Sequence, residues 1–244
     1  MTQGGERAAA YAVVDVETTG LDPEADRVLE VAIVRTDATG RVTTEYASTL
    51  DPGGPVRLTE IHGLTDQAVL GAPAFPDVAA AVAARLTGAV VVGHNVGFDL
   101  AFLRAEYRRA GIAMPVFPAL CTRMLAERLG RTPADGWNLA SCCLDAGVTQ
   151  LAPHTALGDA RSTAALLCAY LALARAAGQD TLAGLGCDPP SSPPQRWVTG
   201  AAYSIRQHRR DGVPVESVLQ APAARLVRGR DAADTLEERL HHLG

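Results

Sequence analysis

The sequence predicts an α/β fold in which helices pack on the faces of a mixed β-sheet. Three observations support this prediction. Runs of β-branched residues gather before position 51, a wholly apolar run of strand length lies at 89–93, and helical patterns occupy most of the chain from 76 to 177. Several strands at the start of the chain, followed by helices with one further strand among them, are typical of a sheet covered by helices.

Four strands can be placed from local pattern. Residues 10–17 (AYAVVDVE) have the Ala/Val run of a buried strand. Residues 27–36 and 41–50 are β-branched runs separated by the turn sequence DATG, which predicts an antiparallel meander. The run AVVVG at 89–93 is apolar throughout, as expected for a short strand that is buried on both faces.

Apolar residues at helical spacing predict five helices. Gly88 and Gly111 end the first two, because glycine commonly terminates helices. The expected helices span 76–87, 98–110, 121–129, 137–145 and about 157–177. Strands and helices in this order give the layout of the ribonuclease H-like architecture, so we expect a mixed five-stranded sheet flanked by helices.

The chain is expected to hold one domain, a linker and a small appendage. Its 244 residues are enough for a domain of about 180 residues, which we place at 8–180. Residues 181–196 include the run CDPPSSPPQ, which predicts a Pro/Ser-rich linker. Residues 197–244 show two or three short helical patterns, which predict a small C-terminal helical segment.

Two carboxylates stand inside the first apolar run. Asp15 and Glu17 are two positions apart, so on a strand they project from one face. Paired carboxylates on a rigid strand form half of a site for a hard cation such as Mg²⁺ or Mn²⁺. Burying both without a cation would cost several kcal/mol. The alternative is a pair of solvated acids at the end of a strand.

A third carboxylate, Asp99, follows the run GHNVG and lies at the beginning of a predicted helix. A helix N-terminus preceded by glycine offers free N–H groups to an anion, and the acid lies at the carboxyl end of a strand. The alternative is an ordinary acidic residue in a first helical turn. Asn95 is expected to fix the turn that precedes it.

His154 and Asp159 lie five positions apart across the start of the long helix. This spacing allows the helical Asp159 to reach a metal while His154 stands on the preceding loop. A neutral imidazole there has a pKa near working pH and can take a proton from an attacking water. Taken alone, a histidine before a helix is more often a surface residue.

The segments DVETTGLDP, GHNVGFDLAFL and HTALGDA resemble the three exonuclease motifs of the DEDD superfamily, in its histidine-bearing DEDDh branch. The likeness is to proofreading exonucleases similar to the epsilon subunit of bacterial DNA polymerase III, and it covers about residues 10–177. IHGLTDQ and WNLASCCLDAGV resemble two further family segments. Cys121 is a departure, because many relatives have Asp at this position, which is not a catalytic ligand.

The resemblance implies a 3′–5′ exonuclease that hydrolyses DNA 3′ ends with two Mg²⁺ or Mn²⁺ ions and releases nucleoside 5′-monophosphates. Asp15 would bridge both ions, and Glu17 and Asp159 would complete the tighter site. Asp99 would support the second ion, and His154 would be the general base. In this mechanism the two ions, about 3.5–4 Å apart, stabilise the attacking and leaving oxygens.

The same resemblance suggests the residues that contact the substrate. Thr18, Gly20 and Leu21 resemble the family's pocket for the terminal nucleotide, and His62 resembles a residue that contacts that nucleotide or its phosphate. Asn95 is grouped with them as a substrate-binding candidate. The structural alternatives are a strand-end turn for Thr18 and Gly20, a core anchor for Leu21 and a loop histidine for His62.

Single-stranded DNA 3′ ends are the expected partner, with a DNA polymerase subunit as a further candidate in proofreading or repair. ETTGL looks more like DNA-processing members, so an RNA-trimming enzyme of the same branch is the alternative. A non-catalytic nucleic-acid-binding subunit is a remote one, because all five catalytic positions are filled. These positions are Asp15, Glu17, Asp99, His154 and Asp159.

Composition restricts these interpretations further. Residues 1–180 carry 14 arginines and 20 acidic residues, which argues against tight coating of duplex DNA and fits an enzyme that grips a few nucleotides. No apolar run reaches the roughly 20 residues that span a bilayer. The first residues lack a basic start before an apolar stretch, so we expect a cytoplasmic protein.

Overall fold

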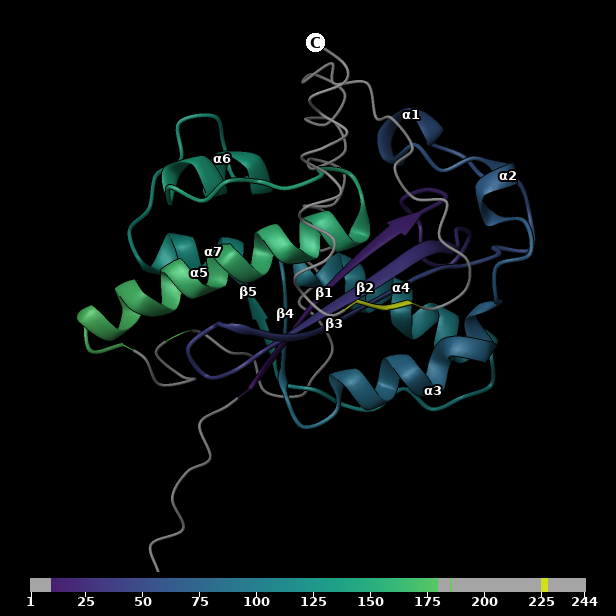
Figure 1. Cartoon of the computed structure of the whole chain (residues 1–244), viewed down its shortest axis with the longest axis horizontal. Coiled ribbons are helices and arrows are strands. Elements are labelled where there is room, and N and C mark those ends of the chain that lie inside the picture. Colours follow the sequence, from purple (N-terminus) through teal and green to yellow (C-terminus); the bar gives the residue numbers. More distant parts are fainter. Residues whose placement is uncertain (1–9, 180–184, 186–224, 228–244) are drawn as a thin grey trace, which may run out of the picture.

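The computed structural model describes residues 10–179, 185 and 225–227 of the chain. These residues form a six-stranded mixed sheet with the order β5-β4-β1-β2-β3-β6, and helices pack against it (Figure 1). The α/β class and the mixed sheet flanked by helices are therefore confirmed. Four of the strands are those placed from the sequence, and the short strands β5 and β6 complete the sheet. No helix in this described part is both long and apolar enough to cross a bilayer.

The three N-terminal strands form the predicted antiparallel meander. Strand β1 (Tyr11–Thr18) pairs with β2 (Val28–Thr36), which pairs in turn with β3 (Val42–Thr49). On the other side of β1, β4 (Val90–Gly93) and then β5 (Ala119–Cys121) add in parallel. The central β1 is thus buried between neighbours on both edges, and its side chains face one of two helical layers.

Side chains alternate along β1 and divide the core into two layers. Ala12, Val14 and Val16 pack into one core, whereas Tyr11 and Val13 pack into the other. Because the strand period is two, every odd-numbered residue of β1 shares the face of Val13. The odd positions after Val13 carry the two carboxylates, so the alternation decides which helices they meet.

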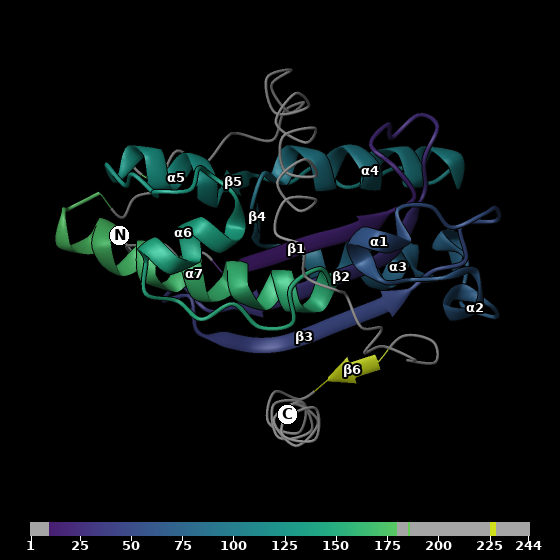
Figure 2. The same ribbon diagram turned by 90° about the horizontal axis from the view of Figure 1, so that it is seen from above.

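Helices α3 (Phe75–Leu86) and α4 (Val96–Arg109) cover the first face. The second face is covered by α5 (Thr122–Arg128), α6 (Leu139–Asp145) and the long α7 (Ala156–Ala176). In Figure 2, α4 and α7 lie on opposite sides of β1. The odd-numbered face of β1 is therefore the face that meets α7.

Three features differ from the sequence prediction or were not anticipated by it. Cys121, where a helix was expected to begin, is instead the last residue of strand β5, because residues 119–121 pair with β4. The helix begins at Thr122. Two one-turn helices, α1 (Thr59–His62) and α2 (Asp66–Val69), lie between β3 and α3. Strand β6 (Arg225–Val227) pairs antiparallel with β3, so these three residues of the expected helical appendage are extended instead.

The rest of the expected C-terminal segment lies outside the described residues, as does the 181–196 linker apart from Leu185. Leu185 is buried against the same core as α7. The domain limits at 8–180 therefore remain a prediction.

Candidate active site

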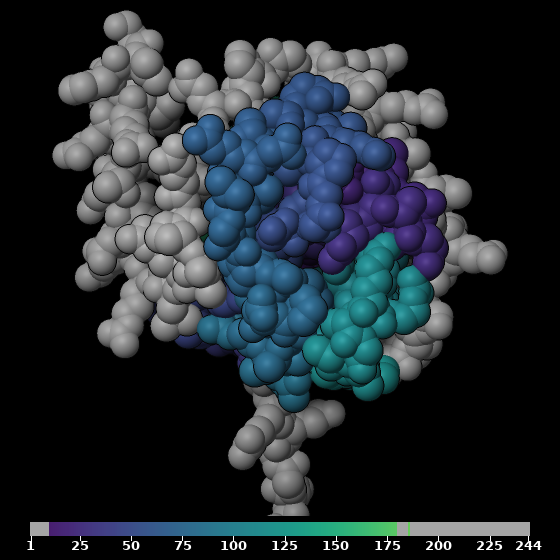
Figure 3. Space-filling model, turned by 90° about the vertical axis from the view of Figure 1, so that its right-hand side faces the viewer, coloured from purple at the N-terminus to yellow at the C-terminus, as the bar shows by residue number. Residues whose placement is uncertain are grey.

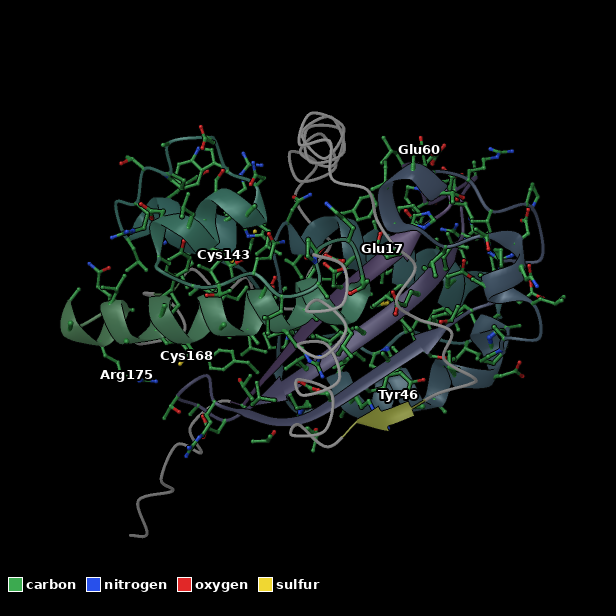
Figure 4. All side chains as sticks on the ribbon, turned by 45° about the horizontal axis from the view of Figure 1, so that its top comes forward. Glu17, Tyr46, Glu60, Cys143, Cys168 and Arg175 are labelled. Carbon is green, nitrogen blue, oxygen red and sulfur yellow. The ribbon has the colours of Figure 1, made fainter. Side chains whose placement is uncertain are left out.

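Asp15 and Glu17 project from β1 on the face that meets α7. Asp159, in the first turn of α7, lies opposite them, and carboxylate oxygens of the three residues are within 4.8 Å of one another. Figure 4 shows Glu17 close to the N-terminal end of α7. The pairing of β1 with β2 is irregular between Glu17 and Thr18. Such bulges often lie beside active sites, where they redirect the strand.

Asp99 reaches the same place from the other side of the sheet. It is buried in the first turn of α4, and its Oδ1 accepts a hydrogen bond of 3.1 Å from the Val16 backbone N–H. Val16 lies between Asp15 and Glu17, so this bond fixes the fourth carboxylate beside the first three. The turn before α4 is tight, because a Cβ on Gly93 would stand 3.0 Å from Val96.

Asp159 also holds the loop that carries His154. Its Oδ2 accepts a hydrogen bond of 3.2 Å from the His154 backbone N–H, and its Oδ1 accepts one of 3.0 Å from Gln150 Nε2. We call residues 149–155 the histidine loop. The four predicted carboxylates and the backbone of His154 therefore lie together where the end of β1 meets the first turns of α4 and α7.

The histidine loop has unusual backbone geometry. Ala152 and His154 have positive φ angles of 42° and 65°, although neither is glycine. Residues in this region carry about 1–3 kcal/mol of strain and persist only where the surroundings impose the conformation. The surroundings here include Gly158, where an added Cβ would lie 2.0 Å from the Ala152 carbonyl oxygen. The loop therefore packs directly on the backbone of α7.

Four crowded carboxylates disturb one another's ionisation. Asp15 and Glu17 keep some solvent contact, but protein surrounds them closely enough that desolvation, followed by the charges of neighbouring acids, raises the pKa of each well above its usual value. Burial raises the pKa of Asp99 to about 8 and that of Asp159 to about 6. Oxygen ligands that repel one another suit a hard divalent cation, which would stabilise their ionised forms.

A fifth carboxylate, Glu30, belongs to this environment and is not among the residues predicted from the sequence. It is almost fully buried on β2, directly across from Glu17, and its Oε2 accepts a hydrogen bond of 2.9 Å from the Ala156 N–H. Burial raises the pKa of Glu30 to about 7. A single acid inside the apolar run VLEVAIV was the available sequence signal.

Three of the predicted nucleotide-binding residues, Thr18, Gly20 and Leu21, lie at the end of β1 and on the loop that leads to β2. Thr18 is buried and its hydroxyl donates to the Gly20 carbonyl at 2.6 Å, whereas Leu21 is 38% exposed. Asp26 organises this loop by accepting hydrogen bonds from the Thr19 hydroxyl and the Asp22 N–H. The loop thus presents Leu21 outward from a fixed turn.

Gly20 is required for this arrangement, because a Cβ on it would stand 2.2 Å from Asp26 Oδ2. An ion pair anchors the end of the loop. Arg27 Nε lies 2.7 Å from Oε1 of the buried Glu106 on α4. Arg108 contacts Glu24 at 2.6 Å, which holds the tip of the loop to the same helix. Figure 3 shows this end of the molecule, with the purple N-terminal segment between the blue segment and teal α4.

His62 and Asn95, the other two predicted substrate-binding residues, lie on other segments of the chain than the β1–β2 loop. The His62 ring is buried, with Nδ1 accepting from the Leu64 N–H at 3.0 Å and Nε2 placed 2.9 Å from the Arg57 carbonyl. Both ring nitrogens are thus occupied inside one loop, and burial lowers the pKa of His62. Asn95 has a left-handed backbone (φ 75°) before α4, as the predicted turn requires. Contact of either residue with a nucleotide stays a prediction.

Residues 12–167 match the sequence profile of a family described as exonuclease (RNase_T). This range contains all four clustered carboxylates and His154, and it covers more than half of the chain. The chain belongs to this exonuclease family. The prediction of an exonuclease from three short motifs is therefore confirmed at the level of the family.

Relatives of this exonuclease domain occur inside larger proteins. A DNA polymerase III subunit epsilon-like protein of Rhodobacter capsulatus is 36% identical over 193 residues, which are 73% of this chain and 27% of the relative. A PolC-type DNA polymerase III of Pediococcus pentosaceus is 32% identical over 68% of this chain and 12% of its own length. The 3′–5′ exonuclease DinG of Bacillus subtilis is 31% identical, over 63% of this chain and 16% of its own length. The chain thus spans little more than a quarter of these curated relatives at most.

Solved structures with the same fold include exonucleases. Exonuclease I of E. coli, in complex with a dT13 oligonucleotide, superposes with a TM-score of 0.62 at 19% identity, over 70% of this chain and 42% of that one. Exonuclease X with 5′ overhanging duplex DNA gives a TM-score of 0.55 at 24% identity, over 72% and 96%. At these identities the likeness shows the fold alone.

Proposed function

We propose that this exonuclease domain is a metal-dependent 3′–5′ exonuclease of the DEDDh type that removes nucleoside 5′-monophosphates from the 3′ ends of single-stranded DNA. The observation that carries the proposal is the convergence of Asp15, Glu17 and Asp159 within 4.8 Å, with Asp99 bonded to the strand between the first two. Carboxylates with raised pKa values have no evident structural use at such density, whereas divalent cations would stabilise them together.

In this proposal the carboxylates would hold two Mg²⁺ or Mn²⁺ ions. Asp15, Glu17 and Asp159 would hold one ion, and Asp99 with Asp15 would hold the other. Bound there, the ions supply positive charge that stabilises the attacking and leaving oxygens of a phosphodiester. Burial raises the pKa of Asp159, and hydrogen bonds from Gln150 and the His154 backbone offset part of this effect; a bound cation would favour the ionised form further.

His154 would act as the general base. Its backbone N–H is bonded to Asp159 Oδ2, so its place on the loop is tied to a metal ligand five residues away. The imidazole would accept a proton from the attacking water, a role that suits histidine because its usual pKa lies near neutral pH. The β1–β2 loop, with Thr18, Gly20 and Leu21, would receive the terminal nucleotide.

DNA is proposed as the substrate because the relatives named above include polymerase III proteins, and E. coli exonuclease I is solved with a dT13 oligonucleotide. A role in proofreading or repair and association with a polymerase subunit belong to the same proposal. RNA trimming uses identical chemistry, and the described residues give no specific observation in its favour.

Degradation of matched single-stranded DNA and RNA oligonucleotides labelled at the 5′ end tests the proposal. With Mg²⁺ or Mn²⁺ we expect a ladder that shortens from the 3′ end, faster on DNA, and no degradation with chelator. Faster loss of RNA would move the protein to RNA trimming. Bound metal without any ladder would favour a non-catalytic binding subunit, and Asp15→Ala controls for contaminating nucleases.

A further inference from the structure

We infer that Glu30 is a positioning residue, which sets the start of α7 so that Asp159 and His154 meet the β1 carboxylates. This inference rests on the proposed function, because it assigns the way in which that site is assembled. Glu30 stands outside the five predicted catalytic positions, and it lies on a different strand from Asp15 and Glu17. Its side chain joins β2 to the backbone of α7.

The joining contact is a hydrogen bond across the core. Glu30 Oε2 accepts the Ala156 N–H at 2.9 Å, and both residues are buried. Ala156 is the first residue of α7, and its N–H is one of the four that the helix itself cannot satisfy. The N-cap residue Thr155 uses its hydroxyl for the Gly158 N–H instead. Glu30 therefore accepts the hydrogen bond of a helix N–H that neither the helix backbone nor its N-cap side chain satisfies.

Ala156 stands between the two functional residues of this region. His154 lies two residues before it and Asp159 three residues after it, so fixing Ala156 fixes the junction between the end of the histidine loop and the first turn of α7. Glu30 is also the register partner of Glu17. The Glu30 side chain thus fixes the start of α7 relative to β2, which pairs with the ligand-bearing strand β1. Outer partners of this kind orient metal ligands, and their loss typically weakens metal binding about 10–100-fold.

The neighbouring strand offers a matched comparison. Glu45 on β3 is also buried and also holds α7, through a two-pronged ion pair with Arg161 whose shortest contact is 2.6 Å. That contact lies beyond Asp159 along the helix and involves no backbone N–H of its first turn. Glu45 therefore holds the middle of the helix to the sheet, whereas Glu30 contacts the backbone at the start of the helix, next to the predicted site residues.

Two conservative variants of Glu30 separate the effect of side-chain length from the effect of charge. Glu30→Gln keeps the length of the side chain and an acceptor oxygen, whereas Glu30→Asp keeps the charge but is one methylene too short. Mn²⁺ binding to the full chain is measured by calorimetry, together with amide hydrogen exchange of the metal-free protein. We expect Glu30→Asp to weaken Mn²⁺ binding about 10-fold or more and to speed exchange in 150–160, and Glu30→Gln to stay within about twofold of wild type.

The control pair, Glu45→Gln and Glu45→Asp, should leave Mn²⁺ affinity unchanged even where it lowers thermal stability. The inference is overturned if Glu30→Gln is impaired as much as Glu30→Asp, which would make charge the important property, or if neither variant changes binding and exchange. The exchange measurement needs neither metal nor DNA. A wild-type protein that degrades no DNA would therefore count against the proposed function, while hydrogen exchange would still decide the role of Glu30.

Discussion

At the scale of single residues, Asp15 stands at the centre of the carboxylate cluster, where its removal should separate activity from folding. We expect Asp15→Ala to abolish metal-dependent cleavage and to leave the metal-free protein as stable as wild type or more stable, because the change relieves repulsion with Asp99, Asp159 and Glu17. Cleavage assays and thermal denaturation with chelator check this. Unfolding of the variant at room temperature would indicate that Asp15 is needed for the fold rather than for a metal.

His154→Ala tests the general base. Turnover should fall by roughly 10²–10⁴-fold, the usual contribution of a positioned base, while Mn²⁺ affinity changes little because the contact to Asp159 uses the backbone N–H. Single-turnover kinetics and calorimetry measure the two quantities. Unchanged turnover would remove His154 from the mechanism.

The clustered carboxylates were predictable from residue type and local setting. An acid in a strand, such as Asp15, or at a helix start, such as Asp99, also has ordinary structural roles, so the prediction depended on the three motifs occurring together. Glu30 and Gln150 were not predictable, for different reasons. Glu30 fits the strand pattern of its neighbours, and Gln150 lies on a loop, where no periodicity distinguishes a partner of Asp159 from a solvated side chain.

At the scale of elements, long strands and helices were predictable and short ones were not. The meander and α7 follow from periodicity over many residues. β5 (Ala119–Cys121) and the one-turn helices α1 and α2 are too short to show a period, and tertiary pairing decides them. β6 pairs with β3 from more than 170 residues further along the chain, and no local pattern predicts such a partner.

The packing of the histidine loop on α7 gives an element-level prediction. In Gly158→Ala, the added Cβ would meet the carbonyl oxygens of Ala152 and Leu151 at 2.0 Å and 2.6 Å, so the loop must move away from the helix. We expect a loss of at least about 10-fold in Mn²⁺ affinity and a larger loss in turnover. Gly54→Ala is the matched control, since nothing lies within 4 Å of its added Cβ. Equal behaviour of the two variants would contradict this packing argument.

At the scale of the whole molecule, the site weakens the metal-free fold. Desolvation raises the pKa values of Asp15, Glu17, Glu30, Asp99 and Asp159 above those of the unfolded chain, so the folded protein retains protons that the unfolded chain releases. The free energy of unfolding therefore decreases as pH rises from the ordinary carboxylate pKa of about 4 to the raised values of about 6–8.

Thermal denaturation in chelator should show this dependence. Between about pH 5 and pH 8 we expect the Tm of the metal-free protein to fall by roughly 5–10 °C, and saturating Mg²⁺ or Mn²⁺ to raise Tm more at the higher pH, because protons no longer compete for the ligands. An Asp15→Asn/Asp159→Asn double variant is the control and should show a shallower decline. A Tm that rises over this pH range in wild type, or a metal effect independent of pH, would contradict the assignment of these carboxylates.

The most direct test of the central claim is release of the 3′-terminal nucleotide from single-stranded DNA in one turnover, compared between wild type and Asp159→Asn. If the carboxylate cluster performs the cleavage, wild type with Mg²⁺ releases a nucleoside 5′-monophosphate from the 3′ end, and Asp159→Asn loses this release although its fold persists. Release of equal rate from both proteins, or products that begin with internal cuts, would contradict the account.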